Sequence, residues 1–373
     1  MRLGSFNVEN LFERAKVLGN ETWTEGKPVL AAFARLNDLF ANDPYTPEDK
    51  AAMLDLLGQL GLLRGDQGRY VLLRKIRGAL LRRQRTGQVS VIAKGRSSWI
   101  GWAELTTEHV TERAMQHTAM VIRDVGADVL GVVEAESRPL LQMFTSAMLA
   151  KVGGTPYPQV MLIEGNDPRG IDVGLLTRGE YPILAIRTHI FDTDQIGPVF
   201  SRDCCEYHLG TPGGERLVVL VNHLKSKGYG DSGDPIGAKR RTRQATLIAQ
   251  IYRGLLAEGA TAVAVIGDFN DDPTSESLAP LLQGTDLRDI SEHPGFDFGP
   301  RLGTFKGGNA RDKIDYILLS PTLFARATGG AVFRQGVFHG PRTKNAWPMY
   351  PTLTADVHAA SDHAAIYADL DLG

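Results

Sequence analysis

Short apolar runs that end in polar side chains recur along this chain. The run at 3–8, LGSFNV, comes first, and continuous runs such as ERLVVLVNH at 215–223 are typical of strands buried on both faces. Amphipathic patterns over 106–126 and 243–259 predict helices. Further predicted strands are ADVLGVVEAE (127–136), GIDVGLLTR (170–178), TAVAVIGDFN (261–270) and KIDYILLS (313–320). This order of elements predicts an α/β fold in which helices flank a layered β-sandwich.

A long segment interrupts the pattern after the first strand. Within it, Thr46 and Asp49 form a capping box around Pro47, which predicts a helix that ends near Gly61. RYVLLRKI (69–76) and QVSVIA (88–93) then predict strands around an arginine-rich connection. Because the polar motifs lie before and after this segment, we expect a single domain, residues 1–373, with an insertion at about 11–105.

The polar residues at the strand ends are the main candidates for chemistry. Buried charges without partners are costly, so a repeated placement of acids, amides and histidines at apolar strand ends predicts that they meet in one cleft. In GDFN, alternation puts Asp268 and Asn270 on one face and turns Phe269 into the core. The complete set is Asn7, Glu134, Glu136, Asn222, His223, Lys225, Asp268, Asn270, Asp315, Asp362 and His363.

Overall composition excludes some classes of protein. The 373 residues are 43% hydrophobic and 23% charged, with a mean hydropathy of -0.15 and no long apolar run, so we expect no membrane span. The first residues contain no apolar segment typical of a secretion signal, and the two cysteines are neighbours, Cys204 and Cys205. We therefore expect a cytoplasmic protein with free thiols.

Charge is distributed unevenly along the chain. The net charge is -2, yet residues 64–96 contain ten Lys and Arg against one acid, a local charge of +9. A second cluster at 225–243 has six basic residues against two acids. Such clusters favour a polyanionic partner, although a solvated surface would explain either one alone.

Six motifs together resemble one family. SFNVENL, ADVLGVVEAE, VNHLKSK, IGDFND, KIDYILL and SDHAAI are similar, in this order, to motifs of the endonuclease/exonuclease/phosphatase superfamily, which includes deoxyribonuclease I and exonuclease III-type enzymes. The resemblance covers the start of the chain and about 128–370. It implies a four-layer α-β-β-α sandwich with the active site at one edge of two packed sheets, whereas the 11–105 segment has no counterpart in the minimal fold.

The resemblance also implies a divalent metal and its ligands. Glu134 would bind Mg²⁺ or Mn²⁺ with help from Asn7 and Asp362, because hard oxygen ligands suit these ions. Glu136 competes with Glu134 for this role, since the acids in VVEAE are two residues apart. We favour Glu134 because it directly follows the apolar run.

The remaining roles follow from phosphoester chemistry on this resemblance. Asp268 and Asn270 would orient a water molecule or the phosphate. His363, paired with Asp315, would be an imidazolium that stabilises developing charge, with general base as the competing role. His223 would donate to a phosphate oxygen or assist the leaving group, and Lys225 and Arg169 would contact phosphate.

Departures from the family pattern bear on the substrate. SDHAA lacks the proline that often follows SDH, and NHLKSK has His223 where apurinic endonucleases tend to have tyrosine. Our leading hypothesis is a metal-dependent phosphodiesterase (nuclease) acting on DNA or RNA, with Trp99, Trp102 or Tyr70 available for stacking on bases. The alternatives are hydrolysis of a small phosphoester, such as a phosphoinositide, nucleotide or phospholipid headgroup, and a non-catalytic binding module.

Overall fold

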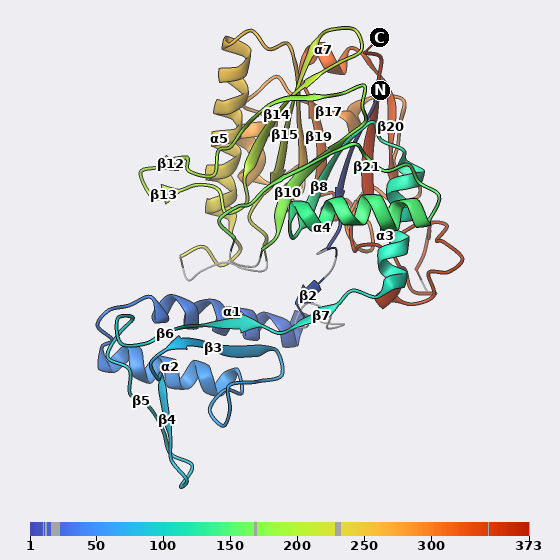
Figure 1. Ribbon diagram of the computed structural model, residues 1–373. Coiled ribbons are helices and arrows are strands. Elements are labelled where there is room, and N and C mark those ends of the chain that lie inside the picture. Colours follow the sequence, from blue (N-terminus) through green and yellow to red (C-terminus); the bar gives the residue numbers. More distant parts are fainter. Residues whose placement is uncertain are drawn as a thin grey trace. The chain divides into compact units, whose positions relative to one another are not determined.

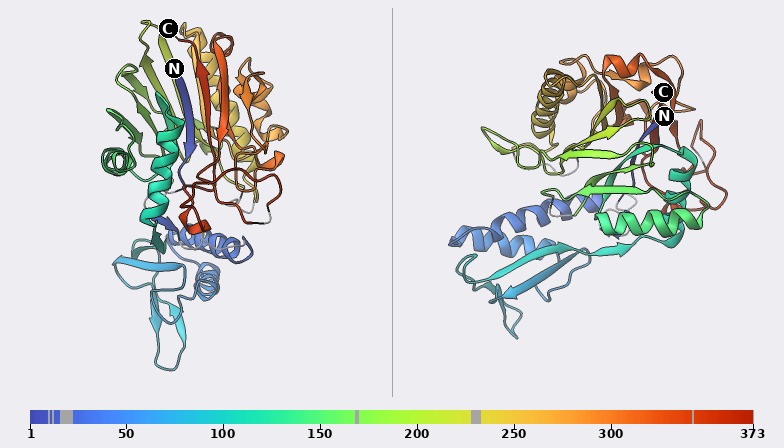
Figure 2. Two further views of the ribbon diagram at one scale, coloured as in Figure 1. Left: turned by 90° about the vertical axis from the view of Figure 1, so that its right-hand side faces the viewer. Right: turned by 45° about the horizontal axis from the view of Figure 1, so that its top comes forward.

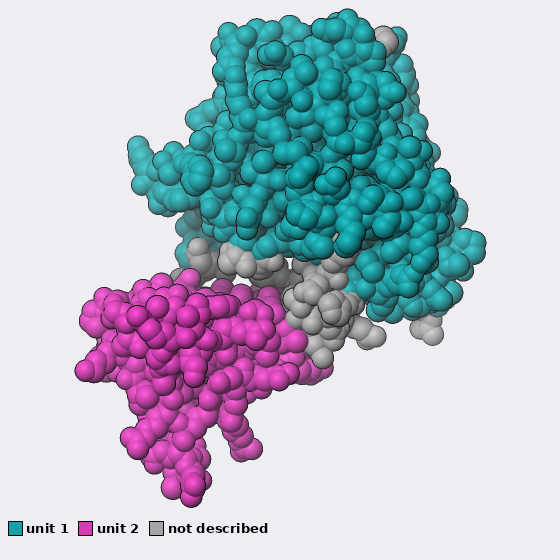
Figure 3. Space-filling model, in the orientation of Figure 1, with its two compact units in different colours: residues 1–12, 110–227, 232–373 teal, residues 13–109, 228–231 magenta. Residues whose placement is uncertain are grey.

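Two compact units make up the chain. The computed structural model describes residues 1–9, 11, 13–15, 23–167, 170–227, 233–341 and 343–372. The larger unit comprises residues 1–12, 110–227 and 232–373, and the smaller comprises residues 13–109 with 228–231 (Figure 3). The smaller unit thus occupies the part of the chain in which the insertion is expected, and the description of a single domain with an insertion stays a prediction.

Two β-sheets packed face to face form the centre of the larger unit (Figure 1). The seven-stranded sheet has the order β18 (Phe296–Asp297), β20 (Ala327–Phe333), β21 (Ala365–Leu370), β1 (Arg2–Asn7), β8 (Val129–Ala135), β10 (Asp172–Thr177) and β9 (Gln159–Ile163). The six-stranded sheet has the order β11 (Ile183–Arg187), β14 (Cys204–Gly210), β15 (Arg216–His223), β16 (Ala262–Asp268), β19 (Asp315–Leu319) and β17 (Arg288–Asp289). Two short strands, β12 (Thr193–Asp194) and β13 (Gly197–Pro198), pair separately as a hairpin.

Helices cover the outer face of each sheet (Figure 2). On the seven-stranded sheet lie α3 (Glu112–Val125), α4 (Arg138–Met143) and the π-helical turn Phe144–Leu149. On the six-stranded sheet lie α5 (Ala238–Ala257) and α6 (Ala279–Leu282), while α7 (Pro321–Phe324) follows β19. The predicted four-layer α-β-β-α sandwich is therefore confirmed.

Burial on both faces explains the continuous apolar runs. Along β15, Leu217, Val219 and Val221 belong to the core between the sheets. Val218 and Leu220 instead pack with residues of α5. A strand between two apolar layers needs apolar side chains at every position, which is why period-two alternation is missing there.

The helix predicted over 106–126 begins later than its pattern suggests. Thr111 is the N-cap and accepts a hydrogen bond from the Ala114 backbone, and α3 ends at Gly126, which has a left-handed φ of 59°. The preceding residues form β7 (Thr107–His109), which pairs with β2 (Glu13–Ala15) in the smaller unit. Strand pairing and the cap at Thr111 thus override the helical periodicity of the first turn.

The smaller unit has its own hydrophobic core. Two helices, α1 (Trp23–Phe40) and α2 (Pro47–Gln59), pack with the pair β3 (Val71–Arg77) and β6 (Ile100–Leu105) and with the hairpin β4 (Leu81–Arg83) and β5 (Val89–Val91). The predicted capping box of α2 is present at Thr46 and Asp49. The sequence analysis did not predict α1, whose first turns contain Gly26 and Pro28, both unfavourable in a helix interior. Among the described residues, no helix is long and apolar enough to cross a bilayer.

Candidate active site

Five strands of the larger unit bring their polar ends to one edge of the two sheets. In the seven-stranded sheet, β1 runs parallel to β8, so that Asn7 pairs with Val133 beside Glu134. In the six-stranded sheet, Asp268 at the end of β16 pairs with His223 of β15 on one side and with Asp315 of β19 on the other. Backbone register therefore holds side chains from distant parts of the sequence next to one another.

Asp268 lies at the centre of this edge. Its Oδ2 atom accepts a hydrogen bond from Asn7 Nδ2 at 3.1 Å. The same oxygen is 3.7 Å from His223 Nε2 and 3.8 Å from His363 Nε2, while Oδ1 accepts from the Asn270 backbone at 2.8 Å. Burial raises the pKa of Asp268, His363 lowers it, and the nearby carboxylates Asp315 and Glu134 raise it further. Negative charge from two neighbouring carboxylates is thus concentrated around Asp268.

His363 is oriented by a chain of hydrogen bonds. Its Nδ1 atom is 2.9 Å from Asp315 Oδ2, and the same oxygen accepts a 2.6 Å hydrogen bond from Thr304 Oγ1. Burial by itself lowers the pKa of His363, but the carboxylates of Asp315 and Asp268 outweigh burial and hold it well above its ordinary value. The carboxylates on both sides of the ring therefore favour its protonated form, and the role of His363 as a cation stays a prediction.

Glu134 reaches the site through a β-bulge. Val133 and Ala135 pair with the adjacent residues Val173 and Asp172, so Glu134 is an extra residue in β8. Its φ is 66°, a left-handed conformation that costs a non-glycine residue about 1–2 kcal/mol. Its Oε1 atom is 3.6 Å from His223 Nε2.

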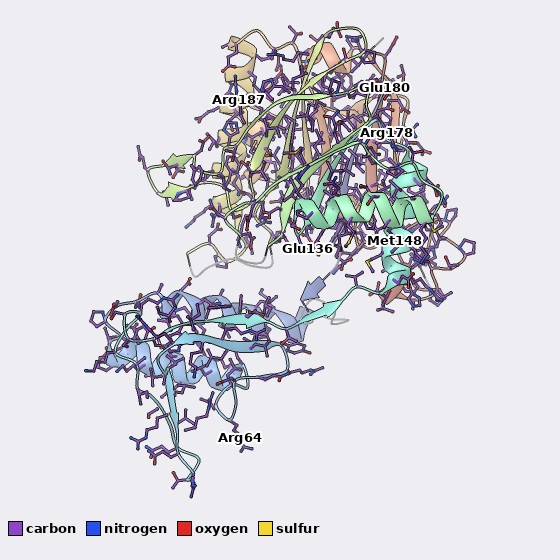
Figure 4. All side chains as sticks on the ribbon, viewed as in Figure 1. Arg64, Glu136, Met148, Arg178, Glu180 and Arg187 are labelled. Carbon is purple, nitrogen blue, oxygen red and sulfur yellow. The ribbon has the colours of Figure 1, made fainter. Side chains whose placement is uncertain are left out.

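The competing acid, Glu136, lies beyond the end of β8 (Figure 4). The 3.6 Å distance between Glu134 Oε1 and His223 Nε2 supports the choice of Glu134 as the metal ligand, which remains a proposal.

Asp362 joins the site from the loop before β21. Its Oδ1 atom is 3.8 Å from His363 Nε2, and its backbone N–H donates to Glu9 Oε2 at 3.0 Å. The Glu9 backbone in turn donates to Asn7 Oδ1 at 3.0 Å. Glu9 thus links the loop after β1 to the loop that carries Asp362 and His363.

The donor set fits a divalent cation. The carboxylates of Glu134 and Asp362 and the amide oxygen of Asn7 are hard oxygen donors. Glu134 and Asp362 lie next to His223 and His363, the two histidines that flank Asp268. Ligand atoms of Asp268, Asp315 and His363 also lie within 4.8 Å of one another. Both Asp315 oxygens, however, lie within hydrogen-bond distance of His363 Nδ1, and one also accepts from Thr304. The Asp315 carboxylate is therefore better placed to orient the histidine than to bind a metal.

The loop after β15 carries the predicted phosphate contact Lys225. Its Leu224 carbonyl accepts hydrogen bonds from Arg202 Nη2 at 3.0 Å and from Asn270 Nδ2 at 3.2 Å. One amide hydrogen of Asn270 therefore holds this loop. Lys225 is half-buried, and Arg169 lies outside the described residues.

Sequence reasoning missed the residues that hold this machinery. Thr304, Arg202 and Arg241 are almost fully buried. Arg241 donates to the Lys225 carbonyl at 2.8 Å and pairs with Asp271 at 3.0 Å. None of the three follows an apolar strand, so the signal used to find the site does not reach them. Arg241 lies in the basic cluster 225–243, and only its contacts in space distinguish a buried arginine from the solvated ones around it.

The fold and this edge define a phosphoesterase of the deoxyribonuclease I-like class. A family model described as the endonuclease/exonuclease/phosphatase family matches residues 97–297, more than half of the chain. The chain belongs to the endonuclease/exonuclease/phosphatase family, a family of phosphoester hydrolases. The resemblance inferred from the six motifs is confirmed.

Solved structures share the fold at low sequence identity. A mannosyl-6-phosphatase from Bacteroides thetaiotaomicron aligns with a TM-score of 0.50 and 17% identity, covering 70% of this chain and 91% of that chain. An endonuclease/exonuclease/phosphatase family protein from the same organism aligns with a TM-score of 0.51 and 18% identity, covering 70% and 87%. No curated protein matches the chain by sequence. At this identity the likeness shows the fold alone.

Proposed function

We propose that the protein is a divalent-metal-dependent phosphodiesterase that hydrolyses nucleic acid. The observation that carries the proposal is the convergence on Asp268 Oδ2 of Asn7, His223 and His363, which come from three separate parts of the chain. A buried acid, a histidine kept cationic and a set of hard oxygen donors are what the hydrolysis of an anionic ester requires.

Each side chain has a role that its contacts allow. Asp268, with a raised pKa, accepts a proton from the attacking water and orients it. His363, held by Asp315, donates to a non-bridging phosphate oxygen and stabilises the charge that develops there. His223, between Glu134 and Asp268, donates to a second phosphate oxygen or to the leaving group.

Glu134, Asn7 and Asp362 are the residues proposed to hold Mg²⁺ or Mn²⁺. Bound there, the ion would supply Lewis-acid stabilisation of the phosphate oxygens. Asn270 completes the site by holding the loop that presents Lys225.

Nucleic acid is the proposed substrate because of the basic cluster at 64–96. The cluster at 225–243 contributes less, since Lys227 and Arg241 pair with Asp271 and Arg243 pairs with Asp194. Backbone phosphates are the polyanion that such clusters suit. A small phosphoester is the second candidate, since all catalytic candidates lie within the larger unit and that fold also serves the bacterial mannosyl-6-phosphatase.

The test is a substrate panel with purified full-length protein. Plasmid DNA, single-stranded DNA, RNA, a phosphoinositide and a sugar phosphate are each incubated with Mg²⁺ or Mn²⁺, with and without EDTA. We expect cleavage of nucleic acid that EDTA abolishes and that His363→Ala lowers at least 100-fold, because the variant removes the charge next to the reacting phosphate.

The matched control is His358→Ala, since the His358 side chain makes its described hydrogen bond to Thr354, away from this site. Its activity should stay within twofold of the wild type. Turnover of a small phosphoester without nucleic-acid cleavage would replace the proposed substrate with the second candidate. Metal-independent binding without any hydrolysis would instead support a non-catalytic module.

A further inference from the structure

The smaller unit concentrates its positive charge in one segment. Helices α1 and α2 carry mixed charge, with Asp38, Glu48, Asp49 and Asp55 alongside Lys27, Arg35 and Lys50. The strand portion, 64–96, has a local net charge of +9. Such a concentration of positive charge attracts polyanions.

Internal pairing leaves a defined group of cations unneutralised. Asp66 pairs with Arg83 at 2.7 Å, and Glu104 pairs with Arg74 at 3.0 Å. Six of the remaining cations of the strand portion are exposed and form no ion pair within the described parts of the chain, namely Arg64, Lys75, Arg77, Arg82, Arg85 and Lys94. Arg77 donates a hydrogen bond to the Ser97 carbonyl at 3.1 Å, and Lys75 alternates onto the face of β3 that carries Val71.

The β4–β5 hairpin concentrates three of these cations. Arg83 turns back to the body of the unit and donates to the carbonyls of Leu63 at 2.8 Å and Gly65 at 3.0 Å, the residues on either side of Arg64. Arg64 therefore lies at the base of the hairpin (Figure 4). Arg82 and Arg85 lie on the hairpin itself, which extends away from the helices of this unit (Figure 1).

One aromatic ring in and near the strands of the smaller unit is open to solvent. Trp99 is 1% exposed and packs edge-on against Phe40, and Tyr70 is 8% exposed, so neither ring can stack on a base. Trp102 is 39% exposed and pairs across the β3–β6 ribbon with Arg74. The ribbon buries its other face through Val71 and Ala103 in the core of the unit.

We propose that the basic strand surface, defined by Arg64, Arg82, Arg85, Lys94 and Trp102, binds single-stranded nucleic acid. Arginine matches the geometry of phosphate oxygens, and the exposed indole provides a face on which an unpaired base can stack. Base stacking requires unpaired bases, which favours a single strand over a duplex. As a device that holds the substrate, this surface rests on the proposed function, whereas binding itself is measured without turnover.

The expected affinity follows from counterion release. Four phosphate contacts on a single strand give a slope of log affinity against log salt of about -2.8, which corresponds to a loss of roughly 50-fold between ~50 and ~200 mM salt. Removing two contacts should make that slope shallower by about 1.4.

The experiment measures fluorescence anisotropy of a labelled 20-nucleotide oligothymidylate with the full-length protein in EDTA. Arg82→Glu/Arg85→Glu should weaken binding at least tenfold and flatten the salt slope. Trp102→Ala should weaken binding at least fivefold at an unchanged slope, since a stacked base contributes that much. Both sites are exposed, so the variants should unfold at the temperature of the wild type.

The matched control is Lys27→Glu/Arg35→Glu, the same change of charge on the helix α1. It should change affinity by less than threefold. An equal loss of affinity in both double variants would mean that net charge alone controls binding, and it would overturn the proposal. So would tighter binding to duplex than to single strand, or binding to vesicles of phosphatidylserine and phosphatidylcholine with no oligonucleotide bound.

The two proposals fail separately. If the oligonucleotide binds as expected and no nucleic acid is hydrolysed in the substrate panel, the proposed function is wrong and the surface stands. If nucleic acid is hydrolysed while the Arg82, Arg85 and Trp102 variants bind as the wild type does, the surface is wrong and the proposed function stands.

Discussion

Asp172 shows how burial alone can change the chemistry of an acid. This first residue of β10 is 2% exposed, and its Oδ1 accepts one hydrogen bond, from the Gly165 backbone at 2.7 Å. Within the described residues, Oδ2 has no hydrogen-bond partner. Burial raises the pKa of Asp172 to about 6, with the Gly165 hydrogen bond lowering it and the nearby acids Glu164 and Asp167 raising it.

The raised pKa of about 6 for Asp172 makes stability depend on pH. The folded protein keeps this proton up to about pH 6, whereas the unfolded chain releases it near pH 4. The free energy of unfolding of the wild type therefore decreases as pH rises between these values. Asp172→Asn cannot ionise. We expect its free energy of unfolding, relative to the wild type, to increase by about 2–3 kcal/mol from pH 4 to 6.5 and then to level off.

Urea unfolding in EDTA at half-unit pH steps measures this difference. Subtracting the two proteins cancels the other titrating groups, because both chains share them. A difference that is constant with pH would show that Asp172 ionises normally in the folded state.

At the scale of elements, the loop 224–227 is held by buried cations on other elements. Arg241 of α5 is fully buried, donates to the carbonyls of Lys225 and Ile236 at 2.8 Å, and pairs with Asp271. Asp271 also accepts from Ser275 and Ser277 and pairs with Lys227 at 2.5 Å. The loop with the predicted phosphate contact is thus tied both to α5 and to the segment after GDFN.

Arg241→Met should destabilise the larger unit by about 3 kcal/mol, because it leaves the buried Asp271 with one cationic partner fewer. It should also free the Lys225 backbone, so that trypsin cleaves after Lys225 or Lys227 faster than in the wild type. Chemical denaturation and limited proteolysis with mass spectrometry measure the two effects.

Arg253→Met on the same helix is the control, since Arg253 is exposed. It should change stability by less than about 0.5 kcal/mol. Similar losses of stability in both variants would mean that replacing any arginine of α5 destabilises the protein, and that the buried ion pair contributes no more than an exposed arginine.

At the scale of the whole molecule, the two units have separate cores and the proposed metal site belongs to one of them. Each unit has its own buried cluster, and every proposed metal ligand lies in the larger unit. A ligand that binds only the folded state stabilises the unit that holds it. Metal should therefore raise the unfolding temperature of the larger unit.

We expect Mg²⁺ or Mn²⁺ at 100 times its Kd to stabilise the larger unit by about 2.7 kcal/mol, a shift of roughly 5 °C in calorimetry. Glu134→Gln should abolish the shift, whereas Glu136→Gln, a matched change two residues away, should keep it. The reverse result would reassign the ligand to Glu136. No shift in the wild type would argue against a metal in this site.

The order of motifs and the layer architecture could be predicted from the sequence because their signals are local. An apolar run such as 217–221 identifies a strand buried on both faces wherever it lies. GDFN and SDH each keep their own short pattern, so the candidates Asp268, Asn270, Asp362 and His363 needed no three-dimensional information.

Other features depend on contacts between distant residues. The helix α1 forms although Gly26 and Pro28 disfavour it, because Leu36 and Phe40 pack into the core of the smaller unit. Thr304 is held beside Asp315 by hydrogen bonds to residues far from it in any local pattern: its hydroxyl donates to the Asp315 carboxylate and accepts from the backbone N–H groups of Ile314 and Asp315. Trp102 lies in β6 on the face opposite the buried Ala103, whereas Trp99 precedes the strand and packs against Phe40.

The sequence by itself therefore determined which side chains stand at the strand ends and in which family they occur, since both are properties of short segments. Only the tertiary structure decided where those side chains point. The bulge at Glu134 is an instance: Val133 lies in the core between the sheets and Ala135 in the core under the helices, although regular alternation would put both on one face. Pairing with β10 creates that extra residue, and pairing is set by a strand about forty positions away, beyond the reach of any local pattern.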